Sequence, residues 1–146
     1  MYYPDLSPWH GYQLDGAFKS IGWISKDHPF QKSELTPEVL SALRAYMKEP
    51  VSFWMACGVH RCEFCPPAGP WTWNNTSNRE IWVPTIDVLY VAPVLILHYV
   101  EIHQYKPPDE FIDALMACPR QLSDEWRALT GRQSAYFADC LGLKTR

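Results

Sequence analysis

Apolar residues recur at helical spacing in several stretches of the chain. In residues 36–50 they return every three or four positions, Thr36 is suited to cap the helix, and Pro50 ends it. The same spacing recurs in residues 107–117, where two acidic residues occupy the first turn, and in residues 123–131, between a serine and a glycine. The pattern predicts a helix in each of these three stretches.

Two further helices are predicted from a less regular pattern. Residues 93–105 are largely apolar, begin at a proline that suits the first turn of a helix, and end before two consecutive prolines. Residues 134–143 alternate small, aromatic and aliphatic side chains and are also predicted to be helical.

Stretches that are rich in β-branched and aromatic residues predict short strands. Residues 18–25, 51–57 and 88–92 are of this kind. Residues 71–73 and 79–83 flank a polar segment, NNTSN, whose composition is typical of turns. This arrangement predicts a hairpin in which the two flanking stretches pair.

Strands near the middle of the chain with helices on both sides predict an α+β domain. We expect a small antiparallel sheet or hairpin packed with about four or five helices. Because 146 residues is a length typical of one domain, residues 1–146 are expected to form a single domain. Residues 1–35 show little periodicity beyond one strand and are expected to be largely irregular.

The most informative chemical feature is GVHRCEFC, residues 58–65, which brings three soft-metal donors close together. Cys62 and Cys65 have the C-x-x-C spacing, in which a tight turn directs both sulfurs at one ion, as in zinc knuckles. His98 and His103 follow after 32 intervening residues, with a mutual spacing that zinc sites use. A knuckle, a hairpin and then a helix that carries ligands is, by analogy, the order of a treble-clef zinc domain.

The two histidines of the predicted helix raise a geometric difficulty. Residues five apart on a regular α-helix differ by about 140° of rotation, so His98 and His103 face different ways unless the helix tightens or ends between them. His60 offers another donor, because it lies two residues before Cys62 and points to the same side of an extended segment. The predicted ligands are therefore Cys62 and Cys65 with two of His60, His98 and His103, and the predicted cofactor is one structural zinc ion.

Other interpretations of these residues have less support from the sequence. Iron–sulfur ligation is disfavoured because the other cysteines lack a cluster-like spacing, and a redox pair is disfavoured because prolines follow Cys65 at once. An open zinc site with three protein ligands would favour catalysis, with Glu101 or His28 as the candidate catalytic group. A chain without metal would use His98 as a core histidine that is hydrogen-bonded to a carbonyl.

Composition and charge narrow the classes of partner. Hydrophobic residues make up 47% of the chain and charged residues 20%, as in globular proteins. The net charge is -3 and no long block of one sign occurs, so the clustered basic face that nucleic-acid binding requires is not expected. The most apolar stretch, residues 88–100, is too short to span a bilayer. No secretory signal is visible at the start, and five cysteines suit a reducing compartment, so a cytoplasmic protein without a membrane role is expected.

Two segments of the chain resemble a family of small uncharacterised bacterial proteins. GVHRCEFC fits the family's G-x-H-x-C-x-x-C segment, and PVLILHYVEIHQYKPP fits its P-x-L-I-x-H-Y-x-x-x-H-x-Y-x-P-P segment. By the order of these motifs the resemblance covers residues 21–119, and the mapped positions are His60, Cys62, Cys65, His98, His103, Tyr105, Pro107 and Pro108. The resemblance implies a bacterial origin and a shared site, and it implies no particular activity.

Together these features favour a zinc-stabilised cytoplasmic module that binds another protein and is not an enzyme. Trp71, Trp73 and Trp82 are expected to be exposed and to offer the contact surface, because tryptophan is enriched at the centres of protein interfaces. The alternative is a metal-dependent hydrolase or nuclease with an open zinc site. Neither the partner nor the oligomeric state follows from the sequence.

Overall fold

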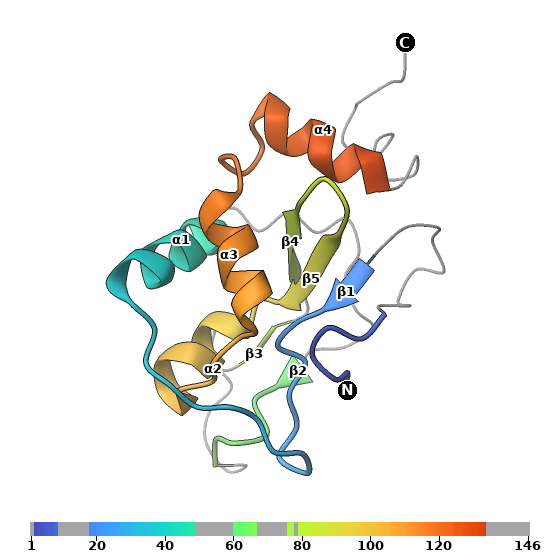
Figure 1. The fold of residues 1–146 in the computed structure, drawn as a ribbon. Coiled ribbons are helices and arrows are strands. Elements are labelled where there is room, and N and C mark those ends of the chain that lie inside the picture. Colours follow the sequence, from blue (N-terminus) through green and yellow to red (C-terminus); the bar gives the residue numbers. More distant parts are fainter. Residues whose placement is uncertain (1, 9–17, 49–59, 67–75, 78, 134–146) are drawn as a thin grey trace.

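A computed structural model of the chain describes residues 2–8, 18–48, 60–66, 76–77 and 79–133 (Figure 1). The helices in these ranges are α1 Pro37–Lys48, α2 Ile96–His103, α3 Asp109–Ala117 and α4 Asp124–Gln133. The strands are β1 Phe18–Ser20, β2 His60–Arg61, β3 Thr76–Ser77, β4 Glu80–Pro84 and β5 Leu89–Pro93. The predicted α+β class, a small sheet packed with helices, is confirmed.

The main sheet has three strands in the order β1–β5–β4. Strands β4 and β5 form an antiparallel hairpin with Glu80 opposite Pro93, whereas β1 runs parallel to β5 with Phe18 opposite Leu89. The sheet is therefore mixed, whereas the sequence analysis expected an antiparallel one. A parallel pair is possible here because the chain between β1 and β5 is long and includes a helix, which allows a crossover connection.

Among the described residues, β4 pairs with β5, which follows it in the chain. A turn joins β4 to β5, in which the Thr85 N–H donates to the Val88 carbonyl at 2.8 Å and the Thr85 hydroxyl accepts the Val88 N–H at 2.9 Å. The expected partner, residues 71–73, and the strand expected at residues 51–57 both lie outside the described residues. A second, two-stranded ladder pairs β2 with β3 beside the cysteine turn.

The helices begin close to their predicted starts, except that α2 begins later, and α4 ends later than predicted. The Thr36 and Ser123 hydroxyls accept N–H groups in the first turns of α1 and α4, as their capping role requires. Helix α4 continues past Gly131, which was predicted to stop it, because a glycine inside a helix costs only about 1 kcal/mol. Helix α2 starts three residues after Pro93, because Pro93 still belongs to β5. The helix predicted at residues 134–143 lies outside the description.

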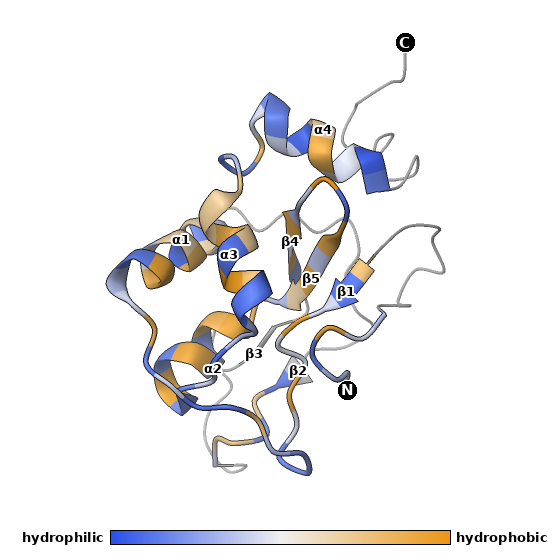
Figure 2. Ribbon diagram, viewed as in Figure 1, coloured by the Kyte–Doolittle hydropathy of each residue, from blue (hydrophilic) through white to orange (hydrophobic). Residues whose placement is uncertain are grey.

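Both faces of the sheet are covered by helices, so alternate side chains of β4 and β5 enter two different apolar clusters. The cluster shared with α4 contains Phe18, Trp82, Leu89, Val91 and Trp126. The larger cluster, on the side of α1, α2 and α3, takes Ile81, Val83, Tyr90 and Ala92 from the sheet. In Figure 2 hydrophobic residues recur along β4, β5, α2 and α3.

Trp82 is not the exposed contact residue that the sequence suggested. Its side chain is fully buried, because Trp126 of α4 packs on the same face of the sheet. Its indole N–H donates to a carboxylate oxygen of Glu80 at 3.4 Å. The other two candidates, Trp71 and Trp73, lie outside the described residues.

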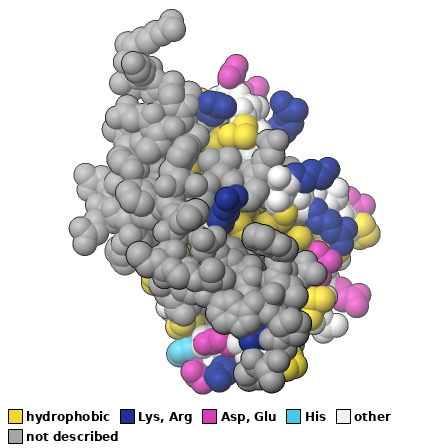
Figure 3. All heavy atoms as spheres, turned by 180° about the vertical axis from the view of Figure 1, so that it is seen from behind, with side chains coloured by type: hydrophobic (Ala, Val, Ile, Leu, Met, Phe, Trp, Pro, Cys, Tyr) yellow, Lys and Arg dark blue, Asp and Glu magenta, His cyan; other side chains and the backbone are white. Residues whose placement is uncertain are grey.

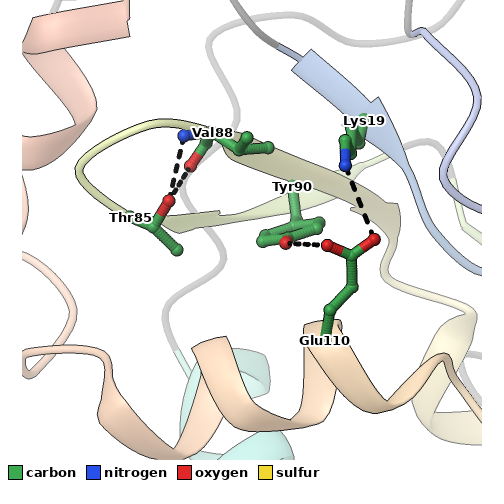
Figure 4. A network of polar contacts seen from close by, with 5 residues as sticks. All are labelled: Lys19, Thr85, Val88, Tyr90 and Glu110. Carbon is green, nitrogen blue, oxygen red and sulfur yellow. Dashed lines mark hydrogen bonds and ion pairs between the residues drawn. The ribbon is translucent and has the colours of Figure 1, made fainter.

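Glu110 connects α3 to two strands of the sheet (Figure 4). Its carboxylate accepts a hydrogen bond from the Tyr90 hydroxyl of β5 at 3.0 Å and forms an ion pair with Lys19 of β1 at 3.5 Å. Burial, together with the neighbouring carboxylate, raises the pKa of Tyr90 to about 12, so this hydroxyl stays a donor at physiological pH. The contact fixes the position of α3 across the sheet.

Residues near the start of the chain contact the end of α2. Asp5 accepts the Gly22 N–H at 2.9 Å and the Tyr105 hydroxyl at 2.8 Å. Gly22 has φ +75° and lies so close to Ile96 that a Cβ there would approach its side chain to 3.1 Å. Two backbone hydrogen bonds also join residues 31–33 to residues 104–106. In the described part of residues 1–35, β1 is the only regular secondary-structure element.

Candidate metal centre

The two cysteines of the site lie on a tight turn that directly follows β2. The Cys62 sulfur accepts the backbone N–H groups of Phe64 and Cys65, and an Arg61 guanidinium N–H donates to the Pro66 carbonyl at 2.9 Å across the turn. Hydrogen bonds from backbone N–H groups to the first sulfur are what a zinc knuckle needs, because they stabilise a thiolate. The local backbone is therefore that of a knuckle.

The histidines come from α2, and the end of this helix solves the problem of their five-residue spacing. Gln104 adopts the left-handed conformation, with φ 57° and ψ 27°, and its N–H donates to the Tyr99 carbonyl five residues back. A regular α-helical bond reaches back four residues, so this closure widens the last turn. The Tyr105 N–H donates to the same carbonyl at 3.0 Å. The wider turn brings His103, the last helical residue, to the side of the helix that carries His98.

Four donor atoms, from Cys62, Cys65, His98 and His103, lie within 4.8 Å of one another. Cys62 Sγ is 3.2 Å from His103 Nε2. Cys65 Sγ is 3.3 Å from His98 Nε2 and 3.6 Å from His103 Nε2. Tetrahedral coordination with Zn–S of about 2.3 Å and Zn–N of about 2.0–2.1 Å separates sulfur from nitrogen by about 3.6 Å. The cluster thus has the size of a tetrahedral site and could hold one metal ion.

Burial shifts the pKa of three of the four donors. Burial is the main cause that raises the pKa of Cys62 to about 11, and the adjacent Cys65 sulfur adds to it. Burial also lowers the pKa of His98, with a contribution from His103, and the pKa of His103, with a contribution from Lys32. The imidazoles are therefore neutral at pH 7, the form that binds metals, whereas the Cys62 thiol needs a bound cation to become a thiolate.

The second ring nitrogen of His98 has no polar contact in the described structure. Its Nδ1 is buried and makes no hydrogen bond there, so the core histidine bonded to a carbonyl is not what these residues show. The ring packs edge-on against His103, with centroids 5.1 Å apart, and against Tyr99 at 6.1 Å. The donor cluster on the Nε2 side is the one polar environment that this imidazole has among the described residues.

Of the remaining predicted residues, Glu101 and His28 lie outside the cluster, and His60 is not tested. His60 lies in β2 opposite Ser77, but its side chain is not described, so its role as a ligand stays a prediction. Glu101 lies on α2 and forms an ion pair with Arg44 of α1 at 3.3 Å. His28 stacks on Tyr2, with ring centroids 3.8 Å apart and planes at 4°. The group of donors found among the described residues contains no carboxylate.

A shallow pocket of about 260 Å³ lies beside the cluster, and sequence reasoning did not find it. Its lining consists of Phe30, Lys32, Phe64, Ile102, His103 and Gln104. The first two residues belong to the segment that was expected to be irregular, and they reach the site because backbone hydrogen bonds join residues 31–33 to the residues after α2. No local pattern in the sequence predicts a contact between residues 31–33 and residues 104–106, which are far apart in the chain.

Residues 1–116 match the family described as Domain of unknown function (DUF7919). The chain belongs to this family. The matched region contains all four donors, whereas α4 lies beyond it. No match was found among curated proteins or among solved structures. An uncharacterised family agrees with the resemblance seen in the sequence, and the bacterial origin implied by that resemblance stays a prediction.

None of the helices in the described residues is long and apolar enough to cross a membrane. On the described part of the face shown in Figure 3, basic, acidic, apolar and neutral side chains all occur.

Proposed function

We propose that this chain is a small cytoplasmic module whose centre is stabilised by one structural zinc ion and which acts by binding another protein. The observation that carries the zinc proposal is the convergence of two sulfurs and two imidazole nitrogens within 4.8 Å. Two thiolates and two imidazoles are ligands that favour zinc over the hard cations magnesium and calcium. A reducing compartment would keep both thiols available for the metal.

A structural role is favoured because the described donors fill a four-coordinate shell. A catalytic zinc ion keeps one position open for water, and four protein ligands leave none. The ion would join the turn at residues 62–65 to the end of α2, two segments that are far apart in the chain. Structural zinc contributes apparent free energies of about 10–16 kcal/mol in small peptides, comparable to the stability of a whole domain.

The positions of the two candidate catalytic groups do not favour a hydrolase or nuclease. Glu101 contacts Arg44 on a neighbouring helix, and His28 is stacked on Tyr2. Protein binding has better support, because Ile102, which is 62% exposed next to His103, lines the shallow pocket together with Phe30 and Phe64. Concave surfaces of this kind are the usual places where ligands and partner side chains bind.

The zinc proposal is tested by measuring the metal content of protein purified without added metal. We expect one zinc ion per chain, and loss of that zinc in Cys65→Ser and in His98→Ala. Two matched controls should keep it. Cys118→Ser removes a partly buried thiol that contacts the Tyr46 hydroxyl at 3.1 Å, and His28→Ala removes a histidine outside the cluster.

His60 provides a sharper test of the ligand set. Because four donors already complete a tetrahedral shell, His60→Ala should also keep one zinc ion per chain. If His60→Ala loses zinc while His98→Ala or His103→Ala keeps it, then His60 is a ligand in place of that histidine. A wild-type protein that contains no metal and binds no added zinc would overturn the proposal altogether.

A further inference from the structure

The pocket beside the metal cluster is built from both halves of the metal site. Phe64 lies between the two cysteines on the turn, and His103 is a donor at the end of α2. Their rings pack with centroids 5.3 Å apart. A metal ion that joins the turn to α2 would therefore fix two walls of this pocket at the same time.

The third wall comes from the segment before α1. Phe30 packs edge-on against Phe64, with centroids 5.3 Å apart, and against Tyr105 at 5.9 Å. The Ser33 N–H donates to the Gln104 carbonyl and the Lys106 N–H to the Gln31 carbonyl, each at 2.9 Å. These contacts hold the aromatic walls in place, so the pocket is preformed and not created by a ligand.

The charge at the pocket is positive. Lys32 is the only lysine, arginine or acidic residue in the lining, and it forms no ion pair within the described part of the chain. Its ammonium lies 5.4 Å from the centre of the Phe30 ring. A zinc ion with two thiolates and two neutral imidazoles has no net charge, so it would not offset this ammonium. A carboxylate that binds next to an apolar group would complement it.

We propose that this pocket binds a segment of a partner protein that carries an aromatic or long aliphatic side chain next to an aspartate or glutamate. The apolar side chain contacts Phe30, Phe64 and Ile102, and the carboxylate pairs with Lys32. This inference rests on the proposed function, since it supplies the chemistry of the protein partner and makes binding depend on the metal that fixes the pocket walls.

The test uses two blocked tetrapeptides, acetyl-Gly-Glu-Phe-Gly-amide and acetyl-Gly-Lys-Phe-Gly-amide, titrated into the zinc-loaded full-length protein and followed by amide chemical shifts. We expect the glutamate peptide to shift the amides of residues 30–32, 64 and 102–104, and to bind about five-fold tighter than the lysine peptide at low salt. Lys32→Glu should reverse that preference. Lys48→Glu, a charge reversal on α1 outside the lining, should leave it unchanged.

Two exposed isoleucines give a matched pair for the apolar contact. Ile102 and Ile86 are 62% and 64% exposed, but only Ile102 lines the pocket, whereas Ile86 lies in the turn between β4 and β5. Ile102→Ala should weaken binding of the glutamate peptide about three-fold, and Ile86→Ala should have no effect. Neither change removes a metal donor, and the zinc content of each variant checks this.

Several outcomes would overturn the inference. Zinc-loaded, folded protein that binds neither peptide, or that binds both equally in the wild type and in Lys32→Glu, refutes the pocket while the zinc proposal stands. Shifts confined to other residues refute the pocket and leave protein binding in place. Shifts at the pocket that persist unchanged after zinc removal refute its dependence on the metal.

Discussion

Two regions of this molecule are held together by different kinds of interaction. Where α4 covers the sheet, Trp82 and Trp126 are fully buried, and each indole N–H has a partner: Glu80 for the first and Tyr46, at 3.2 Å, for the second. At the other region, the cysteine turn follows a two-residue strand, and Phe64 and Cys65 are only partly buried. Burial of large rings is sufficient in the first region. In the second region only Cys62 of the turn is buried, while Phe64 and Cys65 pack at the edge of the larger cluster, and a metal ion bound by the four donors would add a further link.

The largest expected effect comes from removing the metal. A zinc chelator should abolish the protection from hydrogen exchange of amides in residues 62–65 and 98–105, because an ion worth about 10–16 kcal/mol in small peptides no longer joins these segments. The amides of β4 and β5, which pair over five residues each, should lose protection last. Unchanged protection in the cysteine turn after complete zinc removal would contradict the comparison.

The second prediction disrupts the aromatic cluster at α4 and leaves the metal site intact. Trp126→Ala should lower the free energy of unfolding by about 3–5 kcal/mol, because a fully buried tryptophan is replaced by a cavity. Zinc content should remain one per folded chain, since Trp126 contacts no donor of the cluster. Urea unfolding gives the first quantity and metal analysis the second. Trp126→Phe, which keeps most of the ring area, should lose less, and loss of zinc in either variant would show that the two regions are not independent.

The sequence predicted the first region less well than the second. The C-x-x-C spacing follows from the local geometry of one turn, so Cys62 and Cys65 could be identified from the sequence alone. Burial of Trp82 depends on α4, which follows about forty residues later, and no local pattern encodes that contact. The pairing of β4 with β5 was not predicted for a related reason, since the sequence offers turn signals both before and after β4, and the hairpin predicted with residues 71–73 stays a prediction.

The choice among the three histidines shows another limit of local reasoning. A regular helix would separate His98 from His103 by about 140°. The structure brings them together through the widened last turn of α2, which the hydrogen bond from the Gln104 N–H to the Tyr99 carbonyl closes, and nothing in the local sequence predicts that wider turn. The pocket has the same origin, because Phe30 and Lys32 reach it only through backbone pairing with residues 104–106. The spacing in the sequence thus predicts candidate donors, and the geometry of the last turn of α2 determines which of them lie close together.

The next effect depends on pH and concerns the region of α4. Burial raises the pKa of Glu80 to about 8, partly offset by the hydrogen bond from Trp82. Between pH 4.5 and 8 this carboxyl is therefore protonated in the folded chain and ionised in the unfolded chain, so the folded state binds more protons. The contribution of Glu80 to the free energy of unfolding should be most favourable below about pH 4.5. It should fall by up to about 1.4 kcal/mol per pH unit as the pH rises toward 8.

Glu80→Gln isolates this contribution, because glutamine keeps the shape and an acceptor oxygen but does not ionise. Urea unfolding at pH 5, 6, 7 and 8 should give a shallower decline for the variant than for the wild type, and the variant should be the more stable protein at pH 8. Equal slopes for the two proteins would show that Glu80 does not titrate in this range.

The smallest expected effect compares a hydroxyl next to the metal site with a matched hydroxyl elsewhere in the larger cluster. Tyr105→Phe removes the hydrogen bond to Asp5, and Tyr90→Phe removes the hydrogen bond to Glu110. Burial raises the pKa of Asp5, and the hydrogen bond from the Gly22 N–H lowers it. Each should cost about 1 kcal/mol of stability in urea unfolding. Only Tyr105→Phe should also weaken zinc binding, by a few-fold in competition with a chromogenic chelator. The lost hydroxyl contact with Asp5 anchors residue 105, whose backbone N–H closes the turn that places His103 two residues earlier. Equal loss of zinc affinity in both variants would mean that the metal senses global stability and not the position of the α2 end.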